Sequence, residues 1–66
     1  MTKEIRFLID CLIEELSLKL SKDNHIPIID AMNKIYNSQW YDKIMDLETG
    51  LYYQSADYNY INLSKE

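Results

Sequence analysis

The chain has few of the residues that usually build chemical sites. Its 66 residues include one cysteine, one histidine, one proline and one glycine. A structural zinc site takes four ligands, usually Cys or His, which this chain does not have. A single cysteine also forms no internal disulfide. We therefore predict no metal and no cofactor, and expect a fold held by a hydrophobic core or by a partner.

Basic residues are also few, and they are scattered. Seven Lys and Arg stand against eleven Asp and Glu, which gives a formal net charge of −4. Nucleic acid and anionic membrane surfaces are bound by clustered Lys and Arg, so we predict neither as a partner. The apolar-rich residues 5–20 are interrupted by charges and are too short and polar for a membrane span or a signal peptide. A free cysteine without such a segment favours a cytoplasmic protein.

Apolar residues make up 47% of the chain, and their helical periodicity is strongest over residues 3–21. Thr2 can cap the start of this helix, and Glu4 lies in its first turn. Its broad apolar face is formed by Ile5, Leu8, Ile9, Leu12, Ile13, Leu16 and Leu20. A second, nearly opposite strip is formed by Phe7, Cys11 and Leu18. A helix with two apolar sides needs contacts on both of them.

Shorter helices are predicted to follow a polar break at residues 21–24. They cover residues 27–37, 39–47 and 56–63. Pro27 suits the first turn of the second helix because its missing N–H costs nothing there. Ser38 and Ser55 are natural N-caps of the third and the last.

Gly50, the only glycine, marks the next turn. We predict that it has a positive φ and terminates the third helix, with an extended or turn-like segment over residues 51–54. The sequence therefore predicts an all-α fold, a small bundle of three helices plus a short C-terminal helix, in one domain of residues 1–66. The broad face of the first helix is expected to pack against Ile28, Ile29, Met32, Ile35, Trp40, Ile44 and Leu47.

No residue set specifies a reaction, and we predict that the protein is not an enzyme. His25 lies in a polar break without a nucleophile beside it in the sequence, so we interpret it as an ordinary loop residue. Cys11 is mid-helix beside acidic residues, which disfavour a thiolate, so a packing role is expected. The carboxylates of Asp42, Asp46 and Glu48 lack the dense spacing of a metal loop and are read as a solvated face.

Tyrosine is the residue type that the chain has in excess. Four of its six tyrosines follow Gly50, namely Tyr52, Tyr53, Tyr58 and Tyr60. Three interpretations are open: cover for the core, contact with a partner, or stacking against nucleic-acid bases. Stacking platforms are accompanied by basic residues, and only Lys65 is near. Tyrosine is enriched at protein interfaces, so the interface candidates are Phe7, Cys11, Leu18, Tyr52, Tyr53, Tyr58 and Tyr60.

The C-terminal half resembles a family of very short uncharacterised bacterial proteins. The pattern is a Tyr-Asn-Ser break, an aromatic helix, and Asp-x-Glu-Thr-Gly-Leu-Tyr-x-Gln-Ser before a tyrosine-rich helix. It corresponds here to residues 36–38, Trp40 and Tyr41, residues 46–55, and Tyr58. Leu47 is a mild departure, since others often have proline or another residue there. Some members are encoded beside ADP-ribosyltransferase-like toxins. The resemblance therefore implies a helical interaction protein, of which an antitoxin or a toxin-associated subunit is the more specific form.

The sequence thus favours a small protein-interaction module, with a protein partner or a homo-oligomer as its bound state. The resemblance adds the hypothesis of an antitoxin or an accessory subunit of a bacterial toxin system. One alternative is a phage-type or regulatory inhibitor that binds a nucleic-acid-binding protein through an acidic surface. Another is a minimal enzyme or ligand binder, which would show a deep polar pocket with converging titratable groups. A chain of this length buries only about 60% of its unfolded surface, a smaller share than larger domains bury, which is a physical reason to expect association.

Overall fold

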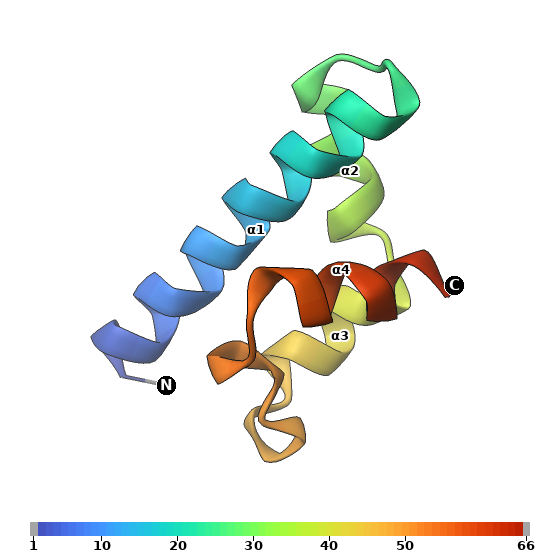
Figure 1. Cartoon of the computed structure of the whole chain (residues 1–66). Coiled ribbons are helices and arrows are strands. Elements are labelled where there is room, and N and C mark those ends of the chain that lie inside the picture. The colour runs from blue at the N-terminus through green and yellow to red at the C-terminus, as the bar shows by residue number, and fades with distance from the viewer. Residues whose placement is uncertain (1, 66) are drawn as a thin grey trace.

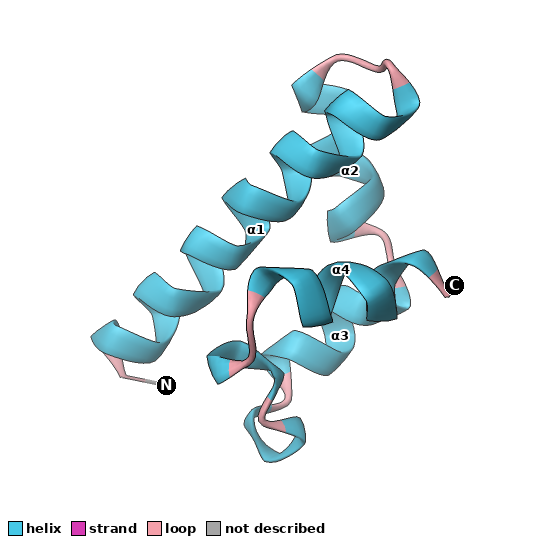
Figure 2. Ribbon diagram, in the orientation of Figure 1, coloured by secondary structure: helices cyan, strands magenta, loops and turns pink. Residues whose placement is uncertain are grey.

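The computed structural model describes residues 2–65, and over that range the protein is all-α without a strand (Figure 2). Four α-helices and two single 3₁₀ turns follow one another: α1 (Lys3–Asn24), α2 (Ile28–Tyr36), α3 (Gln39–Met45), η1 (Leu47–Thr49), η2 (Leu51–Tyr53) and α4 (Ala56–Ser64). In Figure 1, α2 folds back beside the C-terminal half of α1, and α3 and α4 lie next to each other. The predicted all-α class is confirmed.

The first helix is longer than its apolar pattern predicts. It begins after Thr2, whose hydroxyl accepts a hydrogen bond from the Ile5 N–H, and it continues to Asn24 instead of residue 21. Polar residues do not end a helix whose last turn is exposed to solvent. The helix ends at His25, which takes a left-handed conformation with φ 53° and donates its N–H to the Ser21 carbonyl.

The turn around Gly50 is more compact than predicted. Gly50 has φ 70°, as predicted, but it does not terminate the third helix. That helix, α3, already ends at Met45, and Gly50 follows the 3₁₀ turn η1. Residues 51–53 form a second 3₁₀ turn, which is the turn-like one of the two predicted alternatives. Pro27 also differs by one position, because it is the N-cap of α2 and not a residue of its first turn.

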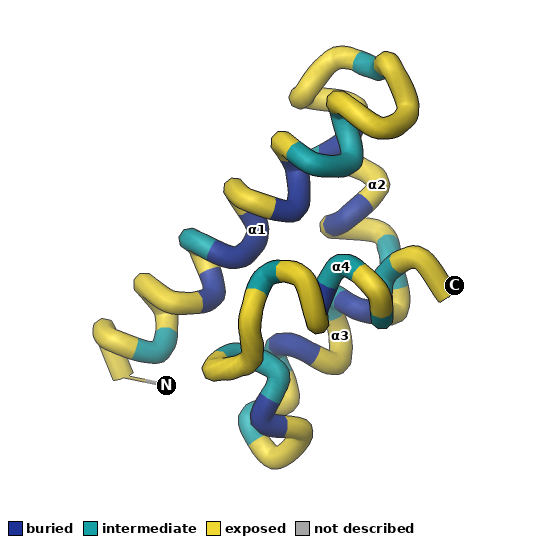
Figure 3. Tube along the Cα trace, in the orientation of Figure 1, coloured by how far each residue is buried: buried dark blue, intermediate teal, exposed yellow. Residues whose placement is uncertain are grey.

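The core lies where α1, α2 and α3 meet, and buried residues line the inner side of α1 (Figure 3). Its fully or nearly buried apolar residues are Ile9, Leu12, Ile13, Leu16, Ala31, Ile35, Trp40 and Ile44. Two predicted core residues of the second helix are wrong: Ile28 and Ile29 are 44% and 60% exposed. Ile29 lies on the outer face of α2, and Ala31, which the apolar pattern overlooked, is buried instead.

Leu8 is a further correction. It belongs to the predicted broad face of α1, yet it is 42% exposed. Leu8 lies toward the N-terminal end of α1, whereas α2 returns beside the other half of the helix (Figure 1). The edge of the apolar face is therefore left open at this end.

A buried polar contact joins α3 to α4. The indole N–H of Trp40 donates to Asn59 Oδ1 at 3.0 Å, and both side chains are fully buried. The Asn59 amide donates in turn to the carbonyl oxygens of Leu51, Gln54 and Ser55. Each polar atom of this pair has a partner, so its burial carries no penalty for an unmade hydrogen bond. The contact fixes η2 and the start of α4 against the core.

Candidate functional site

Side chains in residues 46–55 hydrogen-bond mainly to nearby backbone groups. The Asp46 carboxylate accepts from the Glu48 N–H, and the Thr49 hydroxyl donates to the carbonyl oxygens of Lys43 and Asp46 at 2.9 Å each. Ser55 caps α4 by accepting from the Tyr58 N–H. The polar residues of the family-like motif that make these bonds therefore set the path of the chain, and none of those bonds serves chemistry.

This turn places two tyrosines beside α1. An added Cβ at Gly50 would lie 2.7 Å from the Tyr53 hydroxyl oxygen, so the ring of Tyr53 uses the space that only glycine leaves open. The rings of Tyr52 and Tyr53 meet edge to face, with centroids 4.8 Å apart. Gly50 thus determines both the direction of the chain and the position of Tyr53.

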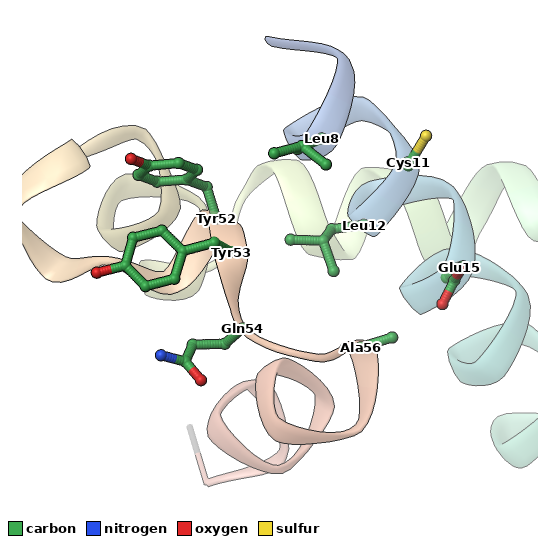
Figure 4. Close-up of a pocket in the computed structure, with 8 residues that line it drawn as sticks. All are labelled: Leu8, Cys11, Leu12, Glu15, Tyr52, Tyr53, Gln54 and Ala56. Atoms are coloured by element: carbon green, nitrogen blue, oxygen red, sulfur yellow. The ribbon is translucent and has the colours of Figure 1, made fainter. Parts of the chain in front are cut away.

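A hollow of about 290 Å³ lies between α1 and the segment that follows Gly50. We call it the η2 hollow, and its lining residues are Leu8, Cys11, Leu12, Glu15, Tyr52, Tyr53, Gln54 and Ala56. Figure 4 shows the two tyrosine rings at one end, with Glu15 and Ala56 at the other. The floor is largely apolar, and the carboxylate of Glu15 is the one formal charge among the lining side chains.

The outer face of α1 continues this surface. Phe7, Cys11 and Leu18, which we call the outer strip, lie within about 40° of one another around the helix axis. Phe7 is 67% and Leu18 54% exposed, so neither is covered by α4 or by any other described element. A shallow depression beside Phe7 and Leu8 is lined by α1 residues alone. Leu8 belongs to both depressions and connects the outer strip with the η2 hollow.

One exposed carboxylate lies on each side of the outer strip. At 100° per residue, Glu14 and Glu15 straddle the line that joins Cys11 to Leu18. Within residues 2–65 neither takes part in an ion pair. By contrast, Asp10 lies 3.3 Å from Arg6 one turn away. The middle of the outer strip is therefore apolar with acidic borders.

Two polar contacts hold α4 along α1. Lys19 Nζ lies 3.2 Å from Asp57 Oδ1, and the Tyr60 hydroxyl donates to Asp23 Oδ2 at 2.6 Å. That hydrogen bond raises the pKa of Tyr60 above its ordinary value of 10.0, with smaller contributions from burial and from the negative charge of Asp23. The same contacts place Tyr60 beside the C-terminal end of α1, away from the η2 hollow.

No family model, curated protein or solved structure matches this chain.

Of the predicted interface residues, the fold brings three together in the η2 hollow: Cys11, Tyr52 and Tyr53. Phe7 joins them through Leu8. Leu18 lies further along α1 on the same strip, and Tyr58 is half exposed on α4. The remaining candidate, Tyr60, is held by Asp23 and is only partly exposed. The candidates thus form one continuous surface and two outlying positions.

The residues considered for chemistry occupy ordinary structural positions. His25 ends α1, and Cys11 is a half-buried free thiol at the edge of the hollow. Asp42 is exposed in the first turn of α3, and Asp46 caps η1. Among residues 2–65, no three His, Cys, Asp or Glu side chains are grouped so that they could hold a metal ion. The described helices include none with the length and hydropathy of a membrane span.

Sequence reasoning missed five lining residues of the η2 hollow: Leu8, Leu12, Glu15, Gln54 and Ala56. Leu8 was assigned to the core, although its place at the edge of the broad face would have allowed a border role. Glu15 and Ala56 carry no signal, because their contribution depends on α4 lying beside α1. That two residues 41 positions apart line one hollow is not visible in helical periodicity.

Proposed function

We propose that this chain is a small protein-interaction module that binds a protein partner through the outer strip and the η2 hollow. The observation that supports this is the exposure of Phe7 and Leu18 on one helix face that the chain's own elements leave uncovered. Single exposed apolar residues are common, but aligned ones that join an apolar hollow are typical of interaction sites. The module acts in the cytoplasm and catalyses no reaction of its own.

The more specific role that we propose is an antitoxin or accessory subunit of a bacterial toxin system. Its support is the resemblance of residues 46–55 to the motif of short proteins encoded beside toxins. In the structure these residues form the turn that positions Tyr52 and Tyr53 beside α1. In this chain the motif determines the shape of a candidate binding surface, which is what a non-catalytic subunit needs.

An inhibitor of a nucleic-acid-binding protein is the second candidate. It is favoured by the exposed carboxylates of Glu14 and Glu15 on the borders of the outer strip. Proteins that bind nucleic acid present basic surfaces, to which such borders are complementary. The two candidates differ in the partner's identity: a toxin subunit in the first case, a nucleic-acid-binding protein in the second.

The test is affinity purification of the tagged protein from its native host, followed by mass spectrometry. We expect one partner at fixed stoichiometry. Leu18→Glu should reduce the amount of this partner recovered at least about tenfold, because a buried unpaired carboxylate is costly. Ile29→Glu is the matched control, since Ile29 is a similarly exposed apolar residue on a different helix. Equal recovery of all co-purifying proteins by both variants and the wild type would refute an interaction through this strip.

A further inference from the structure

We infer that the outer strip and the η2 hollow together receive a basic amphipathic helix of another protein, and that they do not receive a second copy of this chain. The inference rests on the proposed interaction function and assigns the chemistry of the partner. It follows from three features of this face: the length of the strip, the shape of the hollow beside it and the sign of the charges beside the middle of the strip.

The geometry of the strip fits a helix. Phe7, Cys11 and Leu18 are spaced by four and seven residues, which is the spacing at which one helix presents a seam to another. The strip is about 16 Å long at 1.5 Å per residue, or about three turns. Beside it, the η2 hollow of about 290 Å³ offers an apolar floor between Leu8, Leu12 and the two tyrosines. A partner helix along the strip can place one large apolar side chain in this hollow.

The charges select the kind of helix. Glu14 and Glu15 border the middle of the strip from both sides, and Glu15 also lines the hollow. Because neither is paired within the described chain, both are available to Lys or Arg side chains beside the apolar seam of a partner. A helix with apolar residues at seam positions and basic residues next to them therefore complements this face in both properties.

The same charges disfavour self-association. A two-fold symmetric dimer sets a surface against itself. With the strips paired in register or with Phe7 opposite Leu18, the Glu14 and Glu15 of both copies meet near the centre. Arg6 does not relieve them, because it lies 3.3 Å from Asp10 in its own helix. Bringing unpaired carboxylates together in an interface that excludes water costs free energy. A second copy of this chain is therefore a less favourable partner for this face than a basic helix.

The test uses two synthetic helical peptides of about four turns, with the same leucine seam. One carries lysine beside the seam, and its twin carries glutamate. Fluorescence anisotropy measures the binding of each labelled peptide to the folded protein. We expect the lysine peptide to bind at least about tenfold more tightly than its twin. Its affinity should fall as NaCl rises from about 50 mM to about 500 mM.

Charge reversal makes the test specific to this face. The double variant Glu14→Lys/Glu15→Lys should reverse the preference and bind the glutamate peptide more tightly. Asp42→Lys/Glu48→Lys makes the same change of net charge at exposed residues of α3 and η1, and should keep the original preference. Circular dichroism of both variants checks that the fold is retained, since all four side chains are exposed.

The inference is overturned if the two peptides bind equally, if neither binds, or if the control pair shifts the preference as strongly as the pair on α1. Concentration-dependent dimerisation that Leu18→Glu abolishes would also overturn it, in favour of the second copy. These failures leave the proposed function standing when affinity purification still recovers a Leu18-dependent partner. If purification with the wild-type protein recovers no Leu18-dependent partner, both the inference and the proposed function are refuted.

Discussion

Left-handed backbone at two residues shows how the turns of this chain are made. Gly50 has φ 70° and no side chain to strain, whereas His25 has φ 53° and carries a full imidazole. A non-glycine residue in this conformation costs about 1–2 kcal/mol. At His25 this left-handed conformation ends α1, and there the His25 N–H donates a hydrogen bond to the Ser21 carbonyl.

Replacing His25 by glycine should therefore stabilise the protein. We expect His25→Gly to raise the free energy of unfolding by about 0.5–1 kcal/mol, because glycine adopts the left-handed conformation without strain. His25→Val should lower it by about 1 kcal/mol, since a β-branched residue resists this conformation. Urea denaturation followed by circular dichroism measures both. An unchanged midpoint in His25→Val would show that the turn rearranges instead.

The second residue prediction separates two costs at Gly50. Gly50→Ala should destabilise the protein by more than about 1 kcal/mol, from backbone strain and from the contact with the Tyr53 hydroxyl. In a Tyr53→Ala background the contact is absent and only the strain remains. The double-mutant cycle should therefore give a coupling energy of at least about 0.5 kcal/mol. Additive costs would mean that Tyr53 moves aside freely.

The packing of α4 combines polar contacts with apolar side chains at the edge of the core, namely those of Ala56, Tyr60 and Leu63. The residue of this helix that is fully buried is Asn59, and its side chain bonds Trp40 and three backbone carbonyls. At its surface, Asp57 and Tyr60 contact α1. A helix held in this way is specified by hydrogen-bond geometry, and its position is sensitive to single substitutions.

Asn59→Asp should lower the free energy of unfolding more than the very small change in side-chain size suggests. At neutral pH it replaces an amide donor by a carboxylate oxygen that faces the carbonyls of Leu51, Gln54 and Ser55. We expect a loss of at least about 2 kcal/mol, and a smaller loss in acid, where a protonated carboxyl can donate again. Thermal melts at pH 7 and pH 4, compared with wild type at each pH, give the measurement. A loss that is the same at both pH values would argue against the donor role.

The contact between Tyr60 and Asp23 should make stability depend on alkaline pH. The folded pKa of Tyr60 is raised, so the contact contributes fully below pH 10.0, the ordinary pKa, and is lost as pH rises through the folded value. Tyr60→Phe removes it. The variant should be less stable than wild type at pH 7, by at most about 1 kcal/mol because the bond is exposed to solvent.

The measurement is the difference in unfolding free energy between wild type and Tyr60→Phe from pH 7 to pH 11. Taking the difference cancels the other five tyrosines, which are present in both proteins. It should shrink above pH 10. A difference that stays constant, or grows, would show that the hydroxyl stabilises the fold by another route.

The assembled chain presents an apolar face with carboxylates beside its middle, and this combination determines how the protein should associate in solution. The outer strip favours association, while Glu14 and Glu15 oppose pairing with an identical surface. We expect purified protein to be monomeric at high micromolar concentration by light scattering. Leu18→Glu should leave the melting temperature within error of wild type, because Leu18 is 54% exposed in the single chain. A large drop in melting temperature would indicate that Leu18 is buried in a dimer.

Much of this fold is determined by the sequence because the signals are local. Helix periodicity depends on residues within two turns, and the caps at Thr2, Ser38 and Ser55 act on N–H groups three residues away. For the same reason the all-α class, the order of the helices and the positive φ of Gly50 could be predicted. The outer strip is also a local property, since its three members share one helix.

Only the tertiary structure decided which apolar residues are buried and where the surface is hollow. Ala31 is buried and Ile29 is exposed, and which side of α2 is covered depends on how α2 packs against α1. Asn59 lies in the core, where its Oδ1 accepts a hydrogen bond from the indole N–H of Trp40, nineteen positions earlier in the chain. The η2 hollow likewise exists because a turn around one glycine sets two tyrosines against a helix that ended twenty-six residues before Gly50. Contacts of this range follow from how finished helices pack, which local patterns do not encode.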